Sequence, residues 1–266
     1  MLELKPERYS LLEDALSHPL TLCGKPLLAD SSGAVFWPAE KALLVADLHL
    51  EKGSAYAARG TLLPPYDTRQ TLIRLAEAID RYEPERVIAL GDSLTAGFGL
   101  TEKESYPYLL QEKLKADGHD YEVINAGVSG DTSLGGLERA DWVLEQDNAQ
   151  ILILELGAND LLRGVPPTKM KANLDQIIRK AKAKNLKILL CGMLAPPTMG
   201  VEYQREFSTA FPDLASEHKV AYLPFLLENV AMKRELNQAD GIHPNAEGSR
   251  IMTDNVYRAL KALLAR

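Results

Sequence analysis

The sequence is poor in cysteine, histidine and long apolar runs, and each shortage narrows what the protein can be. Cys23 and Cys191 are its only cysteines, which is too few for a disulfide framework, so we expect two buried thiols in a reducing cytoplasm. Its five histidines leave few candidates for metal binding or acid–base catalysis. No apolar run approaches the ~20 residues that span a bilayer. The N-terminal segment MLELKPERYS has no apolar core typical of a signal peptide, so we expect a cytoplasmic protein without a membrane span.

An excess of positive charge is also missing. Lysine and arginine total 30 and aspartate and glutamate total 37, which gives a formal net charge of −7. This balance argues against a partner such as nucleic acid that is held by bulk electrostatics. Hydrophobic residues make up 46% and charged residues 25%, as in ordinary globular proteins, so wholesale disorder is excluded. A chain of 266 residues is long enough to bury a sizeable core in one large domain or two small ones.

From residue 86 onward, buried strands alternate with amphipathic helices. This alternation predicts βαβ units and therefore an α/β fold with a parallel sheet. The expected strands are residues 86–93, 121–127, 149–157, 186–194 and 219–225. Helices are expected between them, among them 133–146 and 204–217, and a last helix from about 245 to 264.

The N-terminal third has a different pattern. Two short apolar bursts predict one or two hairpin strands, and residues 41–50 predict a further, buried strand. A Gly- and Pro-rich loop is expected over 53–66, followed by an amphipathic helix that Asp67 caps. We therefore predict an α+β extension over residues 1–85 and the main α/β domain over 86–266.

Four polar motifs follow the predicted strands of the main domain. They are Gly91-Asp92-Ser93-Leu94, Asn125 to Asp131, Gly157-Ala158-Asn159-Asp160 and Asp240-Gly241-Ile242-His243-Pro244. Ligands of open α/β sheets bind at the carboxyl ends of the strands, so these motifs should converge on one crevice.

The residue types in these motifs suit acyl transfer. A serine hydroxyl such as that of Ser93 needs a base, which His243 can supply, and Asp240 can fix the tautomer of the imidazole. The Ser93 and Gly130 backbone N–H groups and the Asn159 amide are the available donors for a developing oxyanion. Taken singly, each residue also has a structural explanation: Ser93 as a helix cap, His243 as a loop histidine, and Gly130 and Asn159 as turn residues.

The four motifs, in this order, resemble the SGNH (GDSL-like) hydrolase family, and in particular its bacterial arylesterase and acyl-CoA thioesterase I/lysophospholipase branch. The matching phrases are ALGDSLTAGFGL, NAGVSGDTS, ILELGAND and NQADGIHPN. The resemblance implies a flavodoxin-like three-layer α/β/α fold and hydrolysis of a small acyl ester or thioester, with no metal and no cofactor. It also implies that the loop 195–203, with Pro196, Pro197 and Tyr203, covers the acyl chain. Ala158 stands where this branch usually has the second glycine of Gly-Gly-Asn-Asp. Because Asn159 is kept, we expect an intact oxyanion hole, and because alanine adds a methyl group, we expect a narrower entrance to the acyl pocket.

The segment before the first motif resembles another family. Asp47-Leu48-His49 followed by Gly91-Asp92 is similar to the start of calcineurin-like metallophosphoesterases, especially the ligase-associated DNA-repair branch. The resemblance implies that Asp47, His49 and Asp92 descend from metal ligands. The later histidine-containing blocks of that family are missing from the sequence, so the expected site is vestigial. The chain thus resembles a truncated phosphoesterase start fused to a nearly complete hydrolase, either by natural recombination or by engineering.

Two alternatives to the esterase hypothesis follow from this N-terminal third. One is a metal-dependent phosphodiesterase that uses Asp47, His49 and Asp92. The other is a homo-oligomer assembled through residues 1–85, because a truncated sheet exposes an unpaired edge. The second alternative is compatible with esterase activity.

Overall fold

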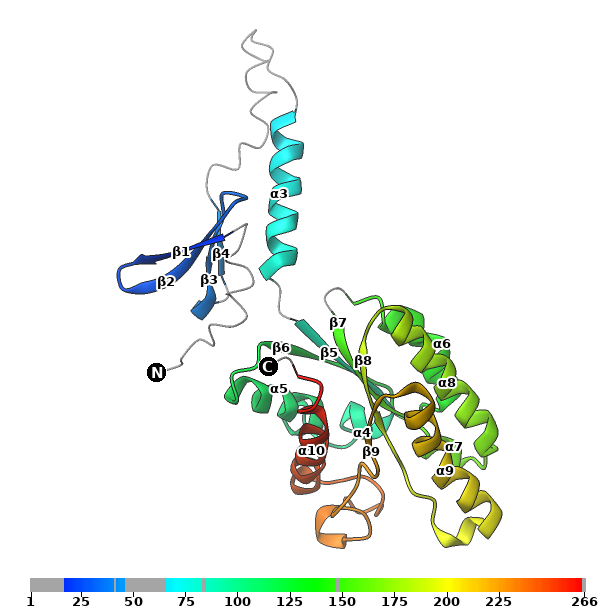
Figure 1. Cartoon of the computed structure of the whole chain (residues 1–266). Helices are drawn as coiled ribbons and strands as arrows, with labels where there is room; N and C mark the ends of the chain where they lie inside the picture. The colour runs from blue at the N-terminus through cyan, green and yellow to red at the C-terminus, as the bar shows by residue number, and fades with distance from the viewer. Residues whose placement is uncertain (1–16, 41, 46–65, 83–84, 147–148, 265–266) are drawn as a thin grey trace, which may run out of the picture. The chain divides into compact units, whose positions relative to one another are not determined.

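The computed structural model describes residues 17–40, 42–45, 66–82, 85–146 and 149–264 (Figure 1). The chain divides into two compact units, residues 1–83 and 84–266. No helix in the described stretches combines the length and apolarity needed to cross a membrane.

The N-terminal unit holds an antiparallel sheet of order β1-β2-β3-β4 and one long helix. Its elements are β1 (Ser17–Leu22), β2 (Lys25–Asp30), β3 (Val35–Trp37), the 3-10 turn η1 (Pro38–Glu40), β4 (Ala42–Leu44) and α3 (Tyr66–Tyr82). The predicted hairpin is confirmed as β1–β2. Its two-residue turn has positive φ at Cys23 and Gly24 (51° and 74°), as hairpin turns of type I′ require.

Three expectations for this unit are wrong. Cys23 is exposed because it lies in the hairpin turn, whereas Cys191 is buried as expected. The strand predicted to be buried is the short β4, whose side chains are half-buried or exposed, and residues 46–50 lie outside the described residues. Helix α3 begins at Tyr66, so Asp67 lies inside its first turn instead of capping it. Of the loop predicted over 53–66, residues 53–65 lie outside the described residues, and Tyr66 is already helical.

The C-terminal unit is a five-stranded parallel sheet of order β6-β5-β7-β8-β9, in which β5 lies between β6 and β7. Its strands are β5 (Glu85–Gly91), β6 (Tyr121–Gly127), β7 (Ala149–Glu155), β8 (Lys187–Cys191) and β9 (Ala221–Leu223). Its helices are α4 (Ser93–Ala96), α5 (Tyr106–Ala116), α6 (Ser133–Val143), α7 (Ala158–Leu162), α8 (Pro167–Ala183), α9 (Val201–His218) and α10 (Ala246–Leu260), with 3-10 turns η2 (Glu102–Glu104), η3 (Pro197–Met199) and η4 (Arg234–Leu236).

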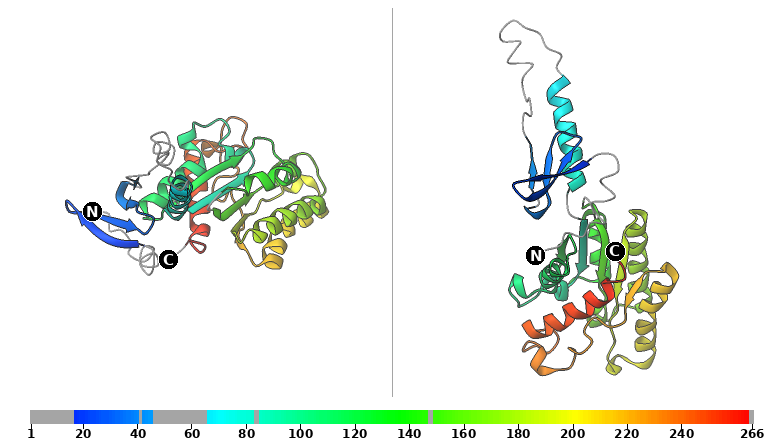
Figure 2. Two further views of the ribbon diagram at one scale, coloured as in Figure 1. Left: turned by 90° about the horizontal axis from the view of Figure 1, so that it is seen from above. Right: turned by 60° about the vertical axis from the view of Figure 1, so that its left-hand side comes forward.

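The helices form two layers around this sheet. Helices α5 and α10 cover one face, and α6, α8 and α9 cover the other (Figures 1 and 2). The side chains of Val87–Leu90 and Ile151–Leu154 are fully buried, because central strands of such a sheet have helices on both sides. The predicted three-layer α/β/α architecture is confirmed, and its strand order is the flavodoxin-like one.

Several strands and helices of this unit begin or end a few residues away from the predicted positions. Strands β8 and β9 are shorter than the apolar runs 186–194 and 219–225, because apolar residues flanking a strand can pack into the core without pairing. Helix α6 ends at Val143 rather than at 146. Helix α9 begins at Val201, so the end of the predicted 195–203 loop is already helical.

Candidate active site

The nucleophile candidate Ser93 lies at a sharp turn between β5 and the one-turn helix α4. The buried carboxylate of Asp92 caps this helix, since its Oδ1 accepts the Leu94 N–H at 2.9 Å. Gly97, with φ at 78°, ends the helix in a left-handed conformation. Ser93 is the first residue of α4, so its N–H is one of those that a helix start leaves without an intrahelical acceptor.

His243 joins Ser93 to Asp240. The Nε2 of His243 lies 2.9 Å from the Ser93 Oγ, although the two residues are 150 positions apart in sequence. The Nδ1 of the same ring lies 2.7 Å from the Asp240 Oδ2. Asp240 Oδ1 in addition accepts the backbone N–H groups of Ile242 (3.0 Å) and His243 (3.1 Å). The bond to the His243 side chain, followed by these backbone bonds, lowers the pKa of Asp240 to about 2.

The loop that carries Asp240 and His243 is held against the turn that follows Ser93. Gln238 Nε2 donates to the Phe98 carbonyl at 2.7 Å and to the Pro244 carbonyl at 2.9 Å. The Phe98 ring lies against the His243 imidazole, with 4.7 Å between the ring centroids. These contacts hold the imidazole within reach of the hydroxyl.

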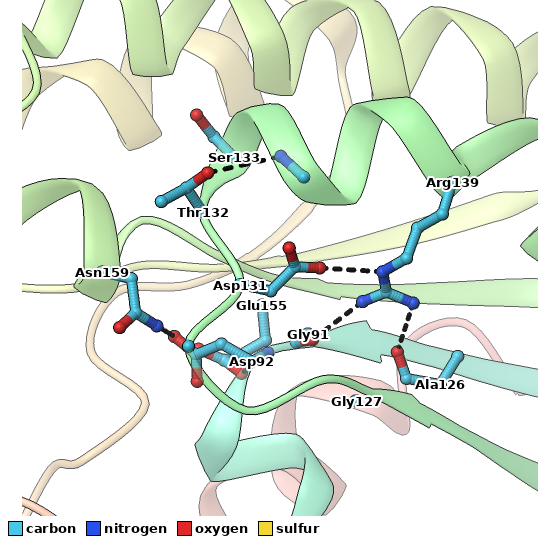
Figure 3. Close-up of polar contacts among 12 residues, drawn as sticks. Gly91, Asp92, Ala126, Gly127, Asp131, Thr132, Ser133, Arg139, Glu155 and Asn159 are labelled. Carbon is cyan, nitrogen blue, oxygen red and sulfur yellow. Dashed lines mark hydrogen bonds and ion pairs between the residues drawn. The ribbon is translucent and has the colours of Figure 1, made fainter.

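Asn159, at the start of α7, points its amide toward the nucleophile turn (Figure 3). Its Nδ2 donates to the Asp92 Oδ2 at 2.9 Å. Since a carboxamide nitrogen carries two hydrogens, this bond orients the amide and leaves one hydrogen for another acceptor.

Gly130 lies in the loop after β6 with φ at 80°, a backbone conformation that favours glycine. Its carbonyl accepts a hydrogen bond from Arg163 Nη2 at 2.6 Å. Among the described residues, no acceptor takes the Gly130 N–H. The structure therefore brings Ser93, His243 and Asp240 into one hydrogen-bonded chain and joins Asn159 to it through Asp92.

Sequence reasoning missed Glu155, the last residue of β7. Its side chain is fully buried, and its Oε2 accepts the Asp92 N–H at 3.2 Å and the Thr95 hydroxyl at 2.8 Å. Burial raises the pKa of both Glu155 and Asp92. The signal was visible in the sequence, because Glu155 interrupts the otherwise apolar run ILILELG.

Arg139, in α6, was missed as well. Its guanidinium donates to the Asp131 carboxylate at 2.8 Å, to the Ala126 carbonyl at 2.7 Å and to the Gly91 carbonyl at 3.0 Å (Figure 3). The sequence held no clear signal for this residue, because a single arginine in an amphipathic helix is typical of a solvated face.

The residues expected to cover the acyl chain lie after β8. Pro196 is exposed, Pro197 begins η3, and Tyr203 lies in the first turn of α9. The Tyr203 hydroxyl donates to the Val165 carbonyl at 2.8 Å. None of the three is hydrogen-bonded to the Ser93–His243–Asp240 chain within the described residues, so their role stays a prediction.

The expected metal ligands Asp47 and His49 lie outside the described residues. Asp92, the third of them, is engaged by Leu94 and Asn159. Across the described ranges, no group of three or more His, Cys, Asp or Glu side chains is arranged to hold a metal ion. The phosphodiesterase alternative therefore stays a prediction from sequence.

Comparison with known proteins finds a TesA esterase both by sequence and by structure. Residues 89–251 match the model of the GDSL-like Lipase/Acylhydrolase family. The chain is 39% identical over 180 residues to the Esterase TesA of Pseudomonas aeruginosa, which covers 68% of this chain and 90% of that protein. It is 37% identical over 180 residues to the Thioesterase 1/protease 1/lysophospholipase L1 of Escherichia coli, covering 68% of this chain and 85% of that protein.

Solved structures agree with these matches. A crystal structure of TesA superposes with a TM-score of 0.65 and 39% identity, covering 68% of this chain and all of that one. The psychrotrophic esterase EstA from Pseudoalteromonas sp., in a structure inhibited by monoethylphosphonate, gives a TM-score of 0.64 and 36% identity, with 67% and 97% coverage. From the family match, these identities and this coverage, the chain belongs to the GDSL-like lipase/acylhydrolase family.

Proposed function

We propose that the protein is a serine ester hydrolase that works through an acyl-enzyme on Ser93. His243 Nε2 takes the hydroxyl proton as the Ser93 oxygen attacks the acyl carbonyl carbon, and Asp240 stabilises the imidazolium that forms. When the tetrahedral intermediate collapses, His243 returns the proton to the departing alcohol. Water then attacks the acyl-enzyme with His243 as base again, which releases the acid and regenerates Ser93.

The negative charge on the carbonyl oxygen needs preorganised donors. We assign this role to the N–H groups of Ser93 and Gly130 and to the free amide hydrogen of Asn159. Supporting this assignment, the Gly130 N–H has no acceptor among the described residues, and Asp92 orients the Asn159 amide. Asp92 is then a positioning carboxylate rather than a metal ligand.

The observation that carries the proposal is the continuous chain from the Ser93 hydroxyl through His243 to Asp240, with links of 2.9 and 2.7 Å. A histidine that lies between a carboxylate and a serine at these distances is the arrangement that general-base activation of a hydroxyl requires. It lies at the carboxyl ends of the strands, where ligands of such sheets bind.

For the substrate we propose short to medium acyl esters, with thioesters and lysophospholipids as further candidates. The relatives named esterase, arylesterase and thioesterase/lysophospholipase support this range. Pro196, Pro197 and Tyr203 are proposed to lie along the acyl chain. A kinetic series over p-nitrophenyl esters and acyl-CoAs of increasing chain length, on wild type and Ser93→Ala, measures the preference.

The decisive substitution is Ser93→Ala. We expect kcat/KM for p-nitrophenyl esters to fall by about 10³- to 10⁶-fold, because the nucleophile is removed while the oxyanion donors remain. Activity of the wild type is expected to be unchanged by EDTA. The matched control is Ser216→Ala, which removes an exposed hydroxyl on α9 and should leave kcat/KM within about twofold. Wild-type activity in Ser93→Ala would refute the proposal.

For the N-terminal third we propose a truncated metallophosphoesterase-like segment of about 1–85 that serves as an assembly module for a cytoplasmic homo-oligomer. The resemblance of Asp47-Leu48-His49 supports the origin, and the four-stranded antiparallel sheet with its two edge strands supports the assembly role.

A further inference from the structure

Arg139 takes no part in the proposed chemical steps, yet it binds three parts of the site. Two of its acceptors are main-chain carbonyls at the carboxyl ends of neighbouring strands, Gly91 in β5 and Ala126 in β6. The third is the side chain of Asp131, the residue after Gly130. Figure 3 shows these three bonds. One guanidinium thus connects the end of β5, two residues before Ser93, with Asp131, the residue after Gly130.

Both carbonyls lie in the last paired residues of β5 and β6, where the register ends at Gly91–Gly127. A carbonyl oxygen has two lone pairs, so it can accept a bond from a guanidinium in addition to a backbone bond. The Gly91 carbonyl also accepts the Val128 N–H at 3.0 Å, which joins the two loops directly. The Arg139 side chain is only 20% exposed and that of Asp131 only 11%, so little water competes for these bonds.

Helix α6, which carries Arg139, is itself anchored to the turn of Asn159. Asp160, the neighbour of Asn159, accepts the Ser133 N–H at 2.7 Å and the Ser133 hydroxyl at 2.6 Å. The start of α6 is therefore bound to the segment after β7, and its middle is bound to the ends of β5 and β6. A residue within two positions of each proposed oxyanion donor is thus hydrogen-bonded to this one helix: Gly91 for Ser93, Asp131 for Gly130 and Asp160 for Asn159.

We propose that Arg139 is a positioning residue of the acyl-transfer site, which holds the Gly130 N–H at its working distance from the Ser93 hydroxyl. The inference rests on the proposed function. A planar guanidinium can donate to three acceptors in fixed directions, whereas the ammonium of lysine is a point charge without this fork. Displacement of a catalytic donor by about 1 Å can cost on the order of 100-fold in rate.

The test compares Arg139→Met and Arg139→Lys with Arg250→Met, a matched control whose arginine is exposed on α10 and pairs with Glu247. Active-site titration with a p-nitrophenyl ester burst first counts the competent sites. Per competent site, we expect kcat of Arg139→Met to fall about 10- to 100-fold with KM within about threefold. Arg139→Lys should recover little of this loss. The Ki of an alkyl trifluoromethyl ketone, whose serine adduct places an oxyanion in the site, should rise by the factor by which kcat/KM falls.

Two outcomes would overturn the inference. In the first, Arg139→Met has fewer competent sites or a lower Tm, but its kcat per competent site and its Ki for the ketone stay within twofold of the wild type. Arg139 would then be a structural residue only. The other is full recovery by Arg139→Lys, which would show that charge alone suffices. If Arg139→Met does not fold, the same readouts on Arg139→Lys decide. Failure of the proposed function is separate, because it would appear as activity that survives Ser93→Ala.

Discussion

At the scale of single residues, hydrogen bonds stabilise the ionised form of the Asp240 carboxylate. It accepts bonds from the His243 ring and from two backbone N–H groups, which hold its pKa at about 2. Asp240 is therefore ionised at neutral and mildly acidic pH. A pKa that is lower in the folded than in the unfolded chain stabilises the fold above the unfolded value of 3.8, and this contribution is lost as pH falls toward 2.

Asp240→Asn tests both consequences. We expect kcat to fall by about 10²- to 10⁴-fold, because an asparagine whose oxygen accepts the two backbone N–H groups turns its NH₂ toward His243 Nδ1. It then holds the wrong tautomer and supplies no charge to stabilise the imidazolium. The Tm difference between wild type and variant should be largest near pH 6 and shrink toward pH 2.5, as measured by circular dichroism. Asp254→Asn, an exposed carboxylate on α10, is the control. A Tm difference that does not change with pH would contradict the assignment.

At the scale of elements, one buried carboxylate joins the sheet of the N-terminal unit to its helix. Asp30, at the end of β2, bonds Arg81 and the Tyr82 hydroxyl in the last turn of α3, and the Tyr82 ring stacks on Phe36 of β3 at 4.3 Å. Burial alone would raise the pKa of Asp30, but the bonds from Ser32, Arg81 and Tyr82 outweigh it and lower the pKa to about 2. Ionised Asp30 therefore fastens α3 to the sheet.

Asp30→Asn should lower the free energy of unfolding of the N-terminal unit by about 1–3 kcal/mol, because charged hydrogen bonds are lost and Arg81 loses its counter-ion. Trp37 lies in β3 and Trp142 is exposed in the other unit, so a Trp142→Phe background leaves Trp37 fluorescence as the reporter of urea unfolding. Glu77→Gln, on the exposed side of α3, makes the same chemical change as a control. Equal midpoints for both variants would refute the role of Asp30.

At the scale of the whole molecule, all residues of the proposed site lie in the unit of residues 84–266, as does the family match over 89–251. This unit has its own sheet and its own buried core. We therefore expect deletion of residues 1–83 to leave kcat/KM for p-nitrophenyl esters within about threefold, with Ser93→Ala still abolishing activity in the shortened chain. A loss of more than 100-fold in folded, monodisperse protein would mean that the N-terminal unit contributes to catalysis.

The same deletion tests the assembly proposal through the mass in solution. We expect the full chain to be an oligomer and the shortened chain a monomer by light scattering. An oligomer that persists without residues 1–83, or a monomeric full chain, would exclude this role. Because kcat/KM and mass are measured on the same two proteins, the effect of the deletion on activity can be told apart from its effect on assembly.

The sequence by itself determined the parts of this protein that are local in the chain. Alternating strand and helix patterns predicted the α/β architecture, and the motifs around Ser93, Asn159 and Asp240–His243 predicted which residues would meet, because strand ends of a parallel sheet share one edge. The exposed Cys23 and the half-buried β4 were mispredicted, because the burial of an apolar residue depends on which other elements pack against it, and the local sequence does not show this.

Only the tertiary structure decided how the site is supported. Glu155 reaches the Asp92 backbone and Arg139 reaches the Gly91 carbonyl across 63 and 48 positions of sequence. These bonds exist because β5 lies between β6 and β7 and because α6 packs against β5, where Arg139 reaches the ends of β5 and β6. An alternation of strands and helices is compatible with several strand orders. Which buried polar groups come within hydrogen-bond distance of one another therefore depends on the sheet order, and no local pattern encodes it.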